Sequence, residues 1–578
     1  MKRIPYGNSN FEKIMTENYY FIDKTKYIEK LEELSSQYIF FLRPRRFGKS
    51  LFLSMLEHYY DINRKEQFNV LFKDTYIGKN PTPLKNSYPV LKFNFSMVEI
   101  SGTIKDIEKR FFNYIYGICE NFLKDYKDIF ENVVLKSEEK YSGSGDILNN
   151  ILKLTKGKDF YLMIDEYDNF ANNILIEHGQ DSYMSVTHAE GFLRSFFTII
   201  KGGTDTKTID RIFVTGVSPL VLADVTSGFN IGTNISLEEQ TKFMVGFTQD
   251  ETNSMIDYYI AENIFQKIEK DKILSDLREW YNGYNFSITN PSEKIYNSDM
   301  VLYYINIYLM RSVPPVDMLD DNVRTDYEKI KYLILLNNQL NGNFDILREV
   351  LETGKTEGEL IKSFSIGEEI DITRFRSLLF YLGLTTINES YPDNVFKFVI
   401  PNRVINLMMW GYIIKALKEL YQFKLDTDKL SKLFRNFAFK GDWEIFFSYL
   451  LEKFYEASSI RDFIYREEGV KGFLLAYLNM TNLFKVYSEP EFNKGFADIY
   501  LEPDARFPEI KTGFLIELKY LKAKKNSKLM IEKDFELAKE QIERYAGDKK
   551  KIENIRKIII ILSAKKVLRM EEVKKLIN

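Results

Sequence analysis

The sequence predicts an α/β protein that begins with a mostly parallel sheet covered by helices on both faces. The main observation is that residues 1–255 alternate short strand-like runs with longer amphipathic stretches such as residues 104–135. Parallel strands need long crossover connections, which are usually helices, so this alternation favours a parallel sheet. The strand-like runs are YIFFL, YPVLKFNFS, DFYLMIDE and RIFVTG.

The rest of the chain changes character twice. Residues 256–410 are mainly helical in pattern, with loops at SITNPSEK and SVPPV, and residues 411–470 continue as helices. The C-terminal part returns to strands in GFADIYLE, TGFLIELKY and KIIIILS. A chain of 578 residues is too long for one hydrophobic core, so we predict three domains, at 1–255, 256–410 and 411–578.

Composition excludes several classes of protein. The net charge of -3 argues against a general polyanion binder, although residues 521–578 hold 17 Lys and Arg against 9 Asp and Glu, which would attract nucleic acid there. The single cysteine, Cys119, rules out an intramolecular disulfide and fits a reducing cytoplasm. Three scattered histidines disfavour a triad hydrolase or a multi-histidine metal site. Without a long apolar run or a signal-like N-terminus, we expect a cytoplasmic protein and no membrane.

A strand-like run leads into a phosphate-binding loop. The usual loop reads G-x-x-x-x-G-K-[ST], and here Gly48, Lys49 and Ser50 supply its last three positions, whereas Arg43 stands at the first glycine. In such a loop, backbone N–H groups point at the phosphates, the lysine neutralises them and the hydroxyl binds Mg²⁺. Arg43 can hold the turn if its φ stays negative, and Pro44 biases it to an extended conformation.

The run DFYLMIDEYDN supplies the second half of a nucleotide site. Its apolar strand ends in Asp165 and Glu166, where the first carboxylate would hold Mg²⁺ and the second would polarise the attacking water. The strand RIFVTG ends near Thr215 and Ser218, whose hydroxyls are candidates to sense a γ-phosphate. An ordinary solvated strand end is the alternative for each of these groups.

The strand TGFLIELKY carries a second candidate site. Its apolar residues alternate with Glu517 and Lys519, so we expect one buried face and one face that presents both charges. Burying an acid and a lysine on an apolar strand costs free energy unless the two groups bind a partner or a ligand. Asp498, 19 residues before Glu517, fits a neighbouring strand of a hairpin-like pair. Asp498 and Glu517 would hold a divalent metal, and Lys519 would orient the hydrolytic water and stabilise phosphorane charge.

Several segments of the sequence together resemble a known family. The segments are YFIDKTKYIEKL, FLRPRRFGKSLFLSML, YPVLKFNFS, FYLMIDEYDN, FVTGVSPL, SGFNIGTNIS, VGFTQDE, WYNGYNF and FRSLLFYLGLTT. They are similar to the bacterial AAA-ATPase-like family, whose members carry a C-terminal PD-(D/E)XK nuclease-like domain. The resemblance implies an AAA-related P-loop NTPase core, a helical lid with a winged-helix-like region, and a C-terminal restriction-endonuclease-like α/β domain. At Asn297, the run NSDM departs from a more usual Asn-Pro pairing and leaves the lid boundary open.

The same resemblance assigns roles in the ATPase part. It implies that Lys49 and Ser50 contact phosphates and Mg²⁺, that Asp165 holds Mg²⁺ and that Glu166 is the base. For the loop arginines Arg45 and Arg46, the sequence leaves three kinds of contact open: phosphates, a partner subunit and DNA. The nucleotide-binding set is Arg45, Arg46, Gly48, Lys49, Ser50 and Asp165.

In the C-terminal part, the spacing of Asp498, Glu517 and Lys519 is similar to the PD-(D/E)XK pattern. Glu489 and Glu468 compete as an additional acid of that site. Two residues of KEQIERYAG match the Q-x-x-x-Y helix of RecB-like nucleases, and they are nucleic-acid candidates: Gln541 and Tyr545. Solvated helix residues are the alternative for both.

We therefore expect a nucleotide-gated nuclease that uses ATP, Mg²⁺ or Mn²⁺, and DNA. A homo-oligomer and a role in defence or in a mobile element stay open. The alternative is an ATP-dependent regulatory or protein-binding switch with an inactive nuclease-like domain. ATP-driven translocation on DNA is less favoured, because the sequence shows no helicase motif set.

Overall fold

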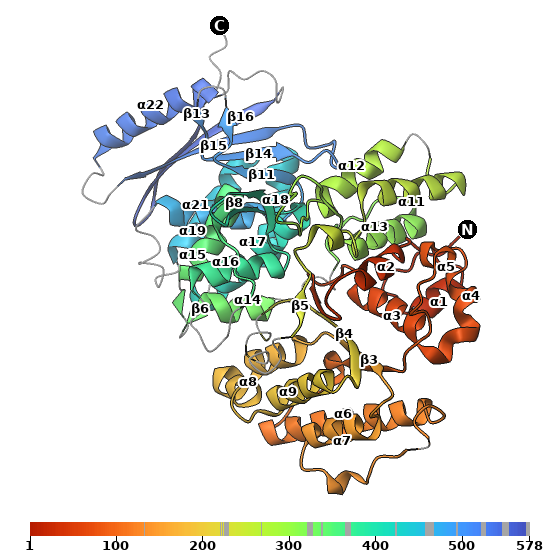
Figure 1. Ribbon diagram of the computed structural model, residues 1–578. Coiled ribbons are helices and arrows are strands. Elements are labelled where there is room, and N and C mark those ends of the chain that lie inside the picture. The colour runs from red at the N-terminus through yellow and green to blue at the C-terminus, as the bar shows by residue number, and fades with distance from the viewer. Residues whose placement is uncertain are drawn as a thin grey trace. The chain divides into compact units, whose positions relative to one another are not determined.

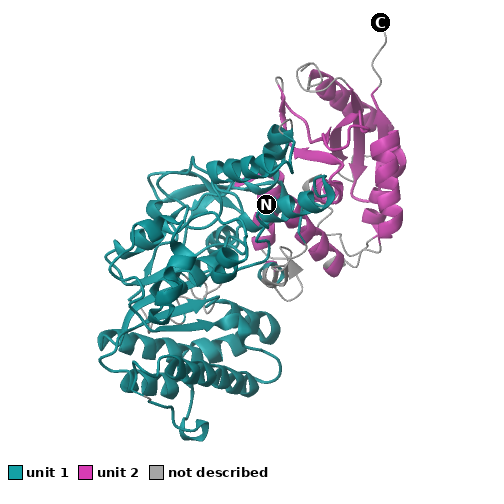
Figure 2. Ribbon diagram, turned by 90° about the vertical axis from the view of Figure 1, so that its right-hand side faces the viewer, with its two compact units in different colours: residues 1–333, 356–405 teal, residues 334–355, 406–578 magenta. Residues whose placement is uncertain are grey.

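The computed structural model divides the chain into two compact units, which Figure 2 colours separately. Unit 1 comprises residues 1–333 and 356–405, and unit 2 comprises residues 334–355 and 406–578. The side chains of Glu468 and Tyr545 are not among those described. The residues outside the description are 132, 220, 222–223, 225–230, 267–268, 321–326, 337–338, 341, 364–370, 422–424, 457–466, 493–494, 522–526, 546–553 and 574–578.

Unit 1 is built on a five-stranded sheet in the order β2-β3-β4-β1-β5, and all of its strand pairs are parallel. This confirms the predicted parallel sheet. Strand β3 is buried along its whole length, as expected where both faces of a parallel sheet are covered. The strands are β1 (Tyr38–Leu42), β2 (Val90–Asn94), β3 (Phe160–Asp165), β4 (Ile209–Gly216) and β5 (Thr233–Asn234).

Helices and a small sheet complete unit 1 (Figure 1). The long helix α6 begins where Thr103 and Asp106 form a capping box, and its apolar stripe is buried. The small sheet has the order β8-β10-β9 and lies within the region predicted to be mainly helical. Its strands are β8 (Lys355–Glu359), β9 (Thr386–Ser390) and β10 (Val395–Val399). The helices include α1 (Phe11–Thr16), α2 (Lys26–Glu32), α3 (Lys49–Tyr60), α4 (Phe68–Phe72), α5 (Tyr76–Lys79), α6 (Ile104–Asp125), α7 (Ser144–Leu154), α8 (Asn169–Thr187), α9 (Phe192–Asp205), α11 (Gln249–Ala261), α12 (Lys270–Tyr281), α13 (Ser298–Arg311), α14 (Tyr327–Ile334) and α16 (Ile372–Tyr381).

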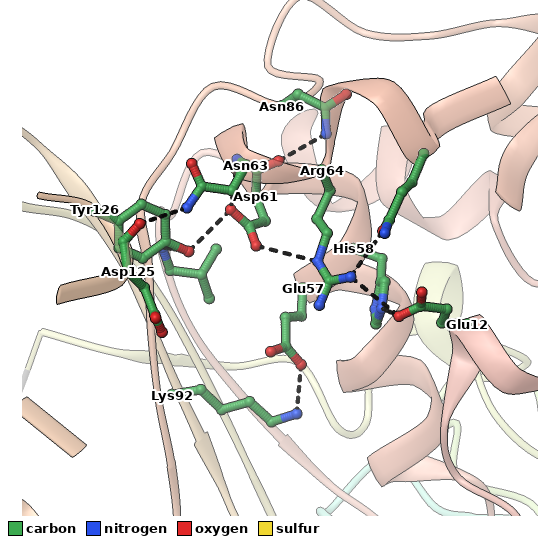
Figure 3. Close-up of polar contacts among 12 residues, drawn as sticks. Glu12, Glu57, His58, Asp61, Asn63, Arg64, Asn86, Lys92, Asp125 and Tyr126 are labelled. Atoms are coloured by element: carbon green, nitrogen blue, oxygen red, sulfur yellow. Dashed lines mark hydrogen bonds and ion pairs between the residues drawn. The ribbon is translucent and has the colours of Figure 1, made fainter. Parts of the chain in front are cut away.

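A polar network at the end of α3 connects the N-terminal helix α1 to the residue that follows α6 (Figure 3). The buried carboxylate of Asp61 accepts a hydrogen bond from Tyr126 Oη at 2.9 Å, and its backbone carbonyl accepts one from Asn86. Arg64 lies between Asp61 and Glu12 of α1, and its Nη1 is 3.1 Å from Glu12 Oε2. Burial raises the pKa of Asp61. The network therefore holds the N-terminal segment beside the helix that follows the phosphate-binding loop.

Unit 2 contains a five-stranded mixed sheet in the order β11-β14-β15-β16-β17. Strands β14 and β15 form the antiparallel neighbours that the sequence predicts, and β15 pairs with β16 in parallel. The strands are β11 (Phe484–Ser488), β14 (Ile499–Pro503), β15 (Gly513–Leu521), β16 (Ile555–Ser563) and β17 (Val567–Glu572). The helices are α15 (Gly342–Thr353), α17 (Arg403–Tyr421), α18 (Thr427–Lys440), α19 (Trp443–Glu456), α21 (Glu467–Leu478) and α22 (Lys528–Tyr545).

Helix α22 is the crossover between the parallel strands β15 and β16 and lies along their sheet (Figure 1). Its residues Phe535, Ala538 and Ile542 belong to one buried cluster with Leu515 and Leu521 of β15. Leu515 and Leu521 share one face of the strand, because side chains alternate along it. No helix in the described ranges is long and apolar enough to cross a membrane.

Candidate functional site

The phosphate-binding loop connects β1 to α3 in unit 1. Gly48 caps the N-terminus of α3 with a φ of 91°, a left-handed conformation that favours glycine. The next residue, Lys49, is buried, and its Nζ donates hydrogen bonds to the carbonyls of Arg43 (2.9 Å) and Pro44 (3.0 Å). The lysine ammonium therefore lies inside the curve of the loop, where backbone N–H groups of a helix N-terminus attract anions.

The structure brings this lysine to the end of β3. Burial lowers the pKa of Lys49 to about 8, and Asp165 is the first of three nearby carboxylates that oppose this shift. Glu166 and Asp168 are the other two. The loop and the acidic strand end thus form one electrostatic cluster, as the two sequence motifs together predict.

The residue after the buried carboxylate of Asp165 is held in an unusual conformation. Glu166 has a φ of 50°, and its backbone N–H donates to Asp165 Oδ1 at 3.0 Å. Asn169 Nδ2 donates to Glu166 Oε2, also at 3.0 Å. Left-handed φ in a non-glycine residue is uncommon and clusters at functional sites. Asn169 therefore orients the carboxylate that the sequence nominates as base, a role that sequence reasoning missed.

The two hydroxyl candidates at the end of β4 and just after it have protein partners. Thr215 Oγ1 donates to the carbonyl of Phe41, and Ser218 Oγ donates to Asp168 Oδ2 at 3.1 Å. Asp168 also accepts from the backbone N–H groups of Val217 and Ser218. Both hydroxyls are fully buried and neither lines the cavity beside the loop. In this structure Thr215 therefore links β4 to β1, and Ser218 links the segment after β4 to the segment after β3.

Arg43, at the position of the missing first glycine, is a structural residue. Its side chain is only 1% exposed, and its guanidinium lies 4.5 Å from the ring centroid of Phe41 and 4.4 Å from that of Phe286. Nη1 donates to the carbonyls of Leu42 (2.9 Å) and Ser236 (2.5 Å). Burial lowers the pKa of Arg43 to about 9, so the group stays charged at pH 7. Its φ is negative, which agrees with the requirement drawn from the sequence.

Replacing Arg43 with alanine is expected to destabilise unit 1 by roughly 2–4 kcal/mol, because it leaves buried carbonyls without a donor and removes a desolvated cation–π contact. Urea denaturation followed by circular dichroism would measure the change. Arg45, an exposed residue of the same loop, is the matched control, and Arg45→Ala is expected to change stability by less than about 0.5 kcal/mol. Equal midpoints for the two variants would contradict this role.

The loop opens into a cavity of ≈ 460 Å³, a size typical of small-ligand pockets. Arg45, Arg46, Lys49, Ser50 and Glu166 line it. The N-terminal segment and the β5–α11 connection also line the cavity, with residues that sequence reasoning missed: Pro5, Gly7, Asn8, Tyr20, Phe21, Met244 and Phe247. The lining combines cationic side chains of the loop with apolar and aromatic side chains, a combination that suits a nucleotide. The residues present therefore fit ATP.

The start of α13 is attached to the phosphate-binding loop. Arg46, with a φ of 68°, has its Nη1 3.4 Å from Asp299 Oδ2, and its carbonyl accepts hydrogen bonds from Ser298 and Asp299. Asn297 Nδ2 donates to the carbonyl of Arg45 at 3.5 Å. Burial raises the pKa of Asp299 to about 6, and Arg46 opposes that shift. The run NSDM thus contacts the loop directly.

The second site lies in unit 2, where the predicted metal ligands come together. Ile499 pairs with Ile516, so Asp498 lies opposite Glu517, one step beyond the last paired residues. Asp498 Oδ2 accepts a hydrogen bond from the backbone N–H of Leu518 at 2.7 Å. Lys519 Nζ is 2.9 Å from Glu517 Oε1. The two carboxylates and the lysine therefore occupy one end of the β14–β15 pair.

Strand β15 buries the face that the sequence predicts to be open. The sequence predicts a buried face and an open face that carries Glu517 and Lys519, whereas Glu517 is only 3% exposed and Leu515 is fully buried. The reason is that α22 packs on the face that Glu517 shares with Leu515 and Leu521. Only Lys519 and Tyr520 are partly exposed.

Gln541 of α22 has a side-chain Oε1 that is buried and lacks a hydrogen-bond partner among the described residues. Buried polar atoms are rarely left unsatisfied, so this atom suits a ligand. The other nucleic-acid candidate, the side chain of Tyr545, lies outside the described residues, as does that of Glu468.

The charges of two lysines act on the carboxylate of Asp498. Burial raises its pKa, and Lys471 of α21 and Lys519 oppose that shift, whereas Glu489 adds to it. Within the described ranges, no set of three or more His, Cys, Asp or Glu side chains is arranged to hold a metal ion. A divalent cation would take the carboxylates of Asp498 and Glu517 and complete its shell with water and substrate oxygens, which oxygen-ligand chemistry permits.

The comparisons with known proteins match an N-terminal and a C-terminal part of the chain. A family model described as a predicted AAA-ATPase matches residues 5–226, and one of the PD-(D/E)XK nuclease superfamily matches residues 465–572, which confirms the resemblance drawn from the sequence. An uncharacterised protein in the vnfD 5' region of Azotobacter chroococcum mcd 1 is 26% identical over 308 residues, 52% of this chain and 52% of that protein. The chain therefore spans about half the length of that curated relative.

Two solved structures are also similar to the chain. A Walker-type ATPase of Pyrococcus abyssi gives a TM-score of 0.37 at 14% identity, and the alignment covers 71% of this chain and 98% of that one. The ORC1 protein of Aeropyrum pernix, solved in complex with DNA, gives a TM-score of 0.27 at 8% identity, with 70% and 96% covered.

Proposed function

Since the chain carries a predicted AAA-ATPase domain and a PD-(D/E)XK nuclease superfamily domain, we propose that it is a divalent-metal-dependent nuclease that cuts DNA under the control of ATP. The observation that carries the proposal is the convergence of Asp498, Glu517 and Lys519 at one end of the β14–β15 pair. The single cysteine is compatible with a cytoplasmic location, where ATP and Mg²⁺ are both available.

In this proposal the residues of unit 2 divide the work. A bound Mg²⁺ or Mn²⁺ supplies Lewis acidity toward a phosphodiester oxygen and lowers the pKa of water. Asp498 and Glu517 hold the ion, and the backbone N–H of Leu518 fixes the direction of the Asp498 carboxylate. Lys519 orients the attacking water and stabilises the charge of the phosphorane. Gln541 offers its buried Oε1 as a further polar contact.

The residues of unit 1 would bind and hydrolyse ATP. Lys49 and the N-terminus of α3 attract the phosphates, and Ser50 and Asp165 hold Mg²⁺. Glu166, oriented by Asn169, acts as base on the attacking water. Arg45 and Arg46 line the same cavity and add positive charge beside the loop.

The chain connectivity supports coupling between the two activities. The polypeptide passes between unit 1 and unit 2 at residues 333–334, 355–356 and 405–406. The loop that would hold the γ-phosphate is attached to α13 through the ion pair between Arg46 and Asp299. Nucleotide contacts that shift such an element control switches in other proteins.

Cleavage assays with the purified full chain test the proposal. Linear and circular DNA are incubated with Mg²⁺ or Mn²⁺, with and without ATP, beside a reaction with EDTA. We expect metal-dependent cutting whose rate changes with ATP. Absence of cutting on DNA and on RNA would overturn the nuclease proposal in favour of the ATP-dependent regulatory or protein-binding switch. A cleavage rate that is the same with and without ATP would refute only the control by ATP and leave the nuclease proposal in place.

A further inference from the structure

A second lysine lies beside the proposed metal site. Lys471 extends from α21, and its side chain is only 8% exposed. Its Nζ is 2.6 Å from Glu489 Oε1, whereas the Glu489 side chain is 64% exposed. Lysine commonly buries its aliphatic stem and keeps its charged end near the surface. The ammonium of Lys471 is therefore paired with a carboxylate that is itself mostly open to solvent.

The backbone holds Glu489 next to the proposed metal ligand. Its N–H donates to the carbonyl of Asp498 at 3.1 Å. Glu489 has a φ of 47° and precedes Pro490, although a residue before proline prefers extended conformations. Left-handed φ costs roughly 1–3 kcal/mol and persists where function or surrounding structure requires it. The strained backbone thus holds Glu489 against the backbone of Asp498 while its side chain pairs with Lys471.

An ordinary structural ion pair explains these contacts less well. A pair with one exposed partner contributes little to stability, at most about 1 kcal/mol. Lys471 is also one of the two lysines whose charge acts on the carboxylate of Asp498. The other, Lys519, bonds to Glu517. Of these two lysines, Lys471 is thus the one whose carboxylate partner is more exposed.

We propose that Lys471 is a second phosphate-binding residue of the nuclease site, and that Glu489 occupies its ammonium until a DNA phosphate replaces the carboxylate. The inference rests on the proposed nuclease function. Under this inference, Glu489 is the ion-pair partner of Lys471 and not a ligand of the metal. Because both groups come from unit 2, the exchange needs no contribution from the nucleotide site.

DNA binding without cutting tests this role. A fluorescent duplex oligonucleotide is titrated with the full chain in Ca²⁺ or EDTA at several salt concentrations. Each phosphate contact contributes about 0.9 to the slope of log affinity against log salt. We expect Lys471→Gln to reduce the slope by about 0.9 and to weaken binding about eightfold near 0.1 M salt. Lys471→Arg is expected to keep the slope, and Glu489→Gln to bind DNA several-fold more tightly.

The outcomes separate this inference from the proposed function. An unchanged slope in Lys471→Gln would show a structural ion pair only and overturn the inference, even if the wild type cuts DNA. Loss of Mn²⁺ binding in Glu489→Gln, measured by calorimetry, would make Glu489 a metal ligand and also overturn it. A wild type that binds DNA but never cuts would refute the proposed function, while the slopes would still decide the role of Lys471. Absence of any DNA binding would overturn both.

Discussion

Replacing Glu517 with glutamine is expected to lower metal-dependent DNA cutting on the order of 10²–10³-fold, the loss typical when a preorganised charge is removed from an active site. Glutamine keeps the size of the side chain on β15 but removes the negative charge that would hold the cation. Glu517 is buried beside Lys519, so an isosteric change is preferable to truncation. The assay compares initial rates on the same linear DNA with Mg²⁺ and with Mn²⁺.

A matched control lies on the neighbouring strand. Glu502 of β14 accepts a hydrogen bond from Tyr487 at 2.9 Å, away from the paired positions of Asp498 and Glu517. Glu502→Gln is expected to cut at the wild-type rate. Calorimetry should show weakened Mn²⁺ binding in Glu517→Gln and not in Glu502→Gln. Wild-type cutting by Glu517→Gln would refute the assignment of the metal site.

Replacing Lys49 with alanine is expected to weaken ATP binding by roughly 2–5 kcal/mol, the range for losing one partner of a buried charge pair. This corresponds to a loss of affinity from roughly 30-fold to several thousand-fold. The variant also loses the two hydrogen bonds to the carbonyls of Arg43 and Pro44, but the sheet contacts of β1 and the buried Arg43 guanidinium remain. We therefore expect a folded protein with an impaired nucleotide site.

Titration with a fluorescent ATP analogue measures the effect. Lys26, an exposed residue of α2 outside the cavity lining, supplies the control Lys26→Ala, which is expected to bind ATP normally. If ATP gates the nuclease, Lys49→Ala should cut DNA at one rate whether or not ATP is present. An ATP affinity equal to that of the wild type would refute the assignment of the phosphate-binding loop.

Much of the fold could be predicted because local patterns agreed with the global arrangement. The apolar runs around residues 38–42 and 160–165 are strands in the structure, and their order in an alternating pattern indicates the parallel sheet. The spacing between Asp498 and Glu517 predicts adjacent antiparallel strands, which the register confirms. The short connection between two strands and the alternation of side chains along a strand are local properties, so both can be predicted from the sequence.

The sequence by itself determined the candidate chemistry: Lys49 with Asp165 in one domain, and Asp498 with Glu517 and Lys519 in the other. Only the tertiary structure showed that the Arg43 guanidinium contacts two aromatic rings and that the N-terminal segment lines the cavity. It also showed that α22 covers the strand face that carries Glu517 and that the charge of Lys471 acts on Asp498. The physical reason is that motifs depend on short-range spacing, whereas burial and ion pairing depend on contacts between segments far apart in the chain. A lysine on a helix is equally compatible with a solvated surface until packing decides which groups surround it.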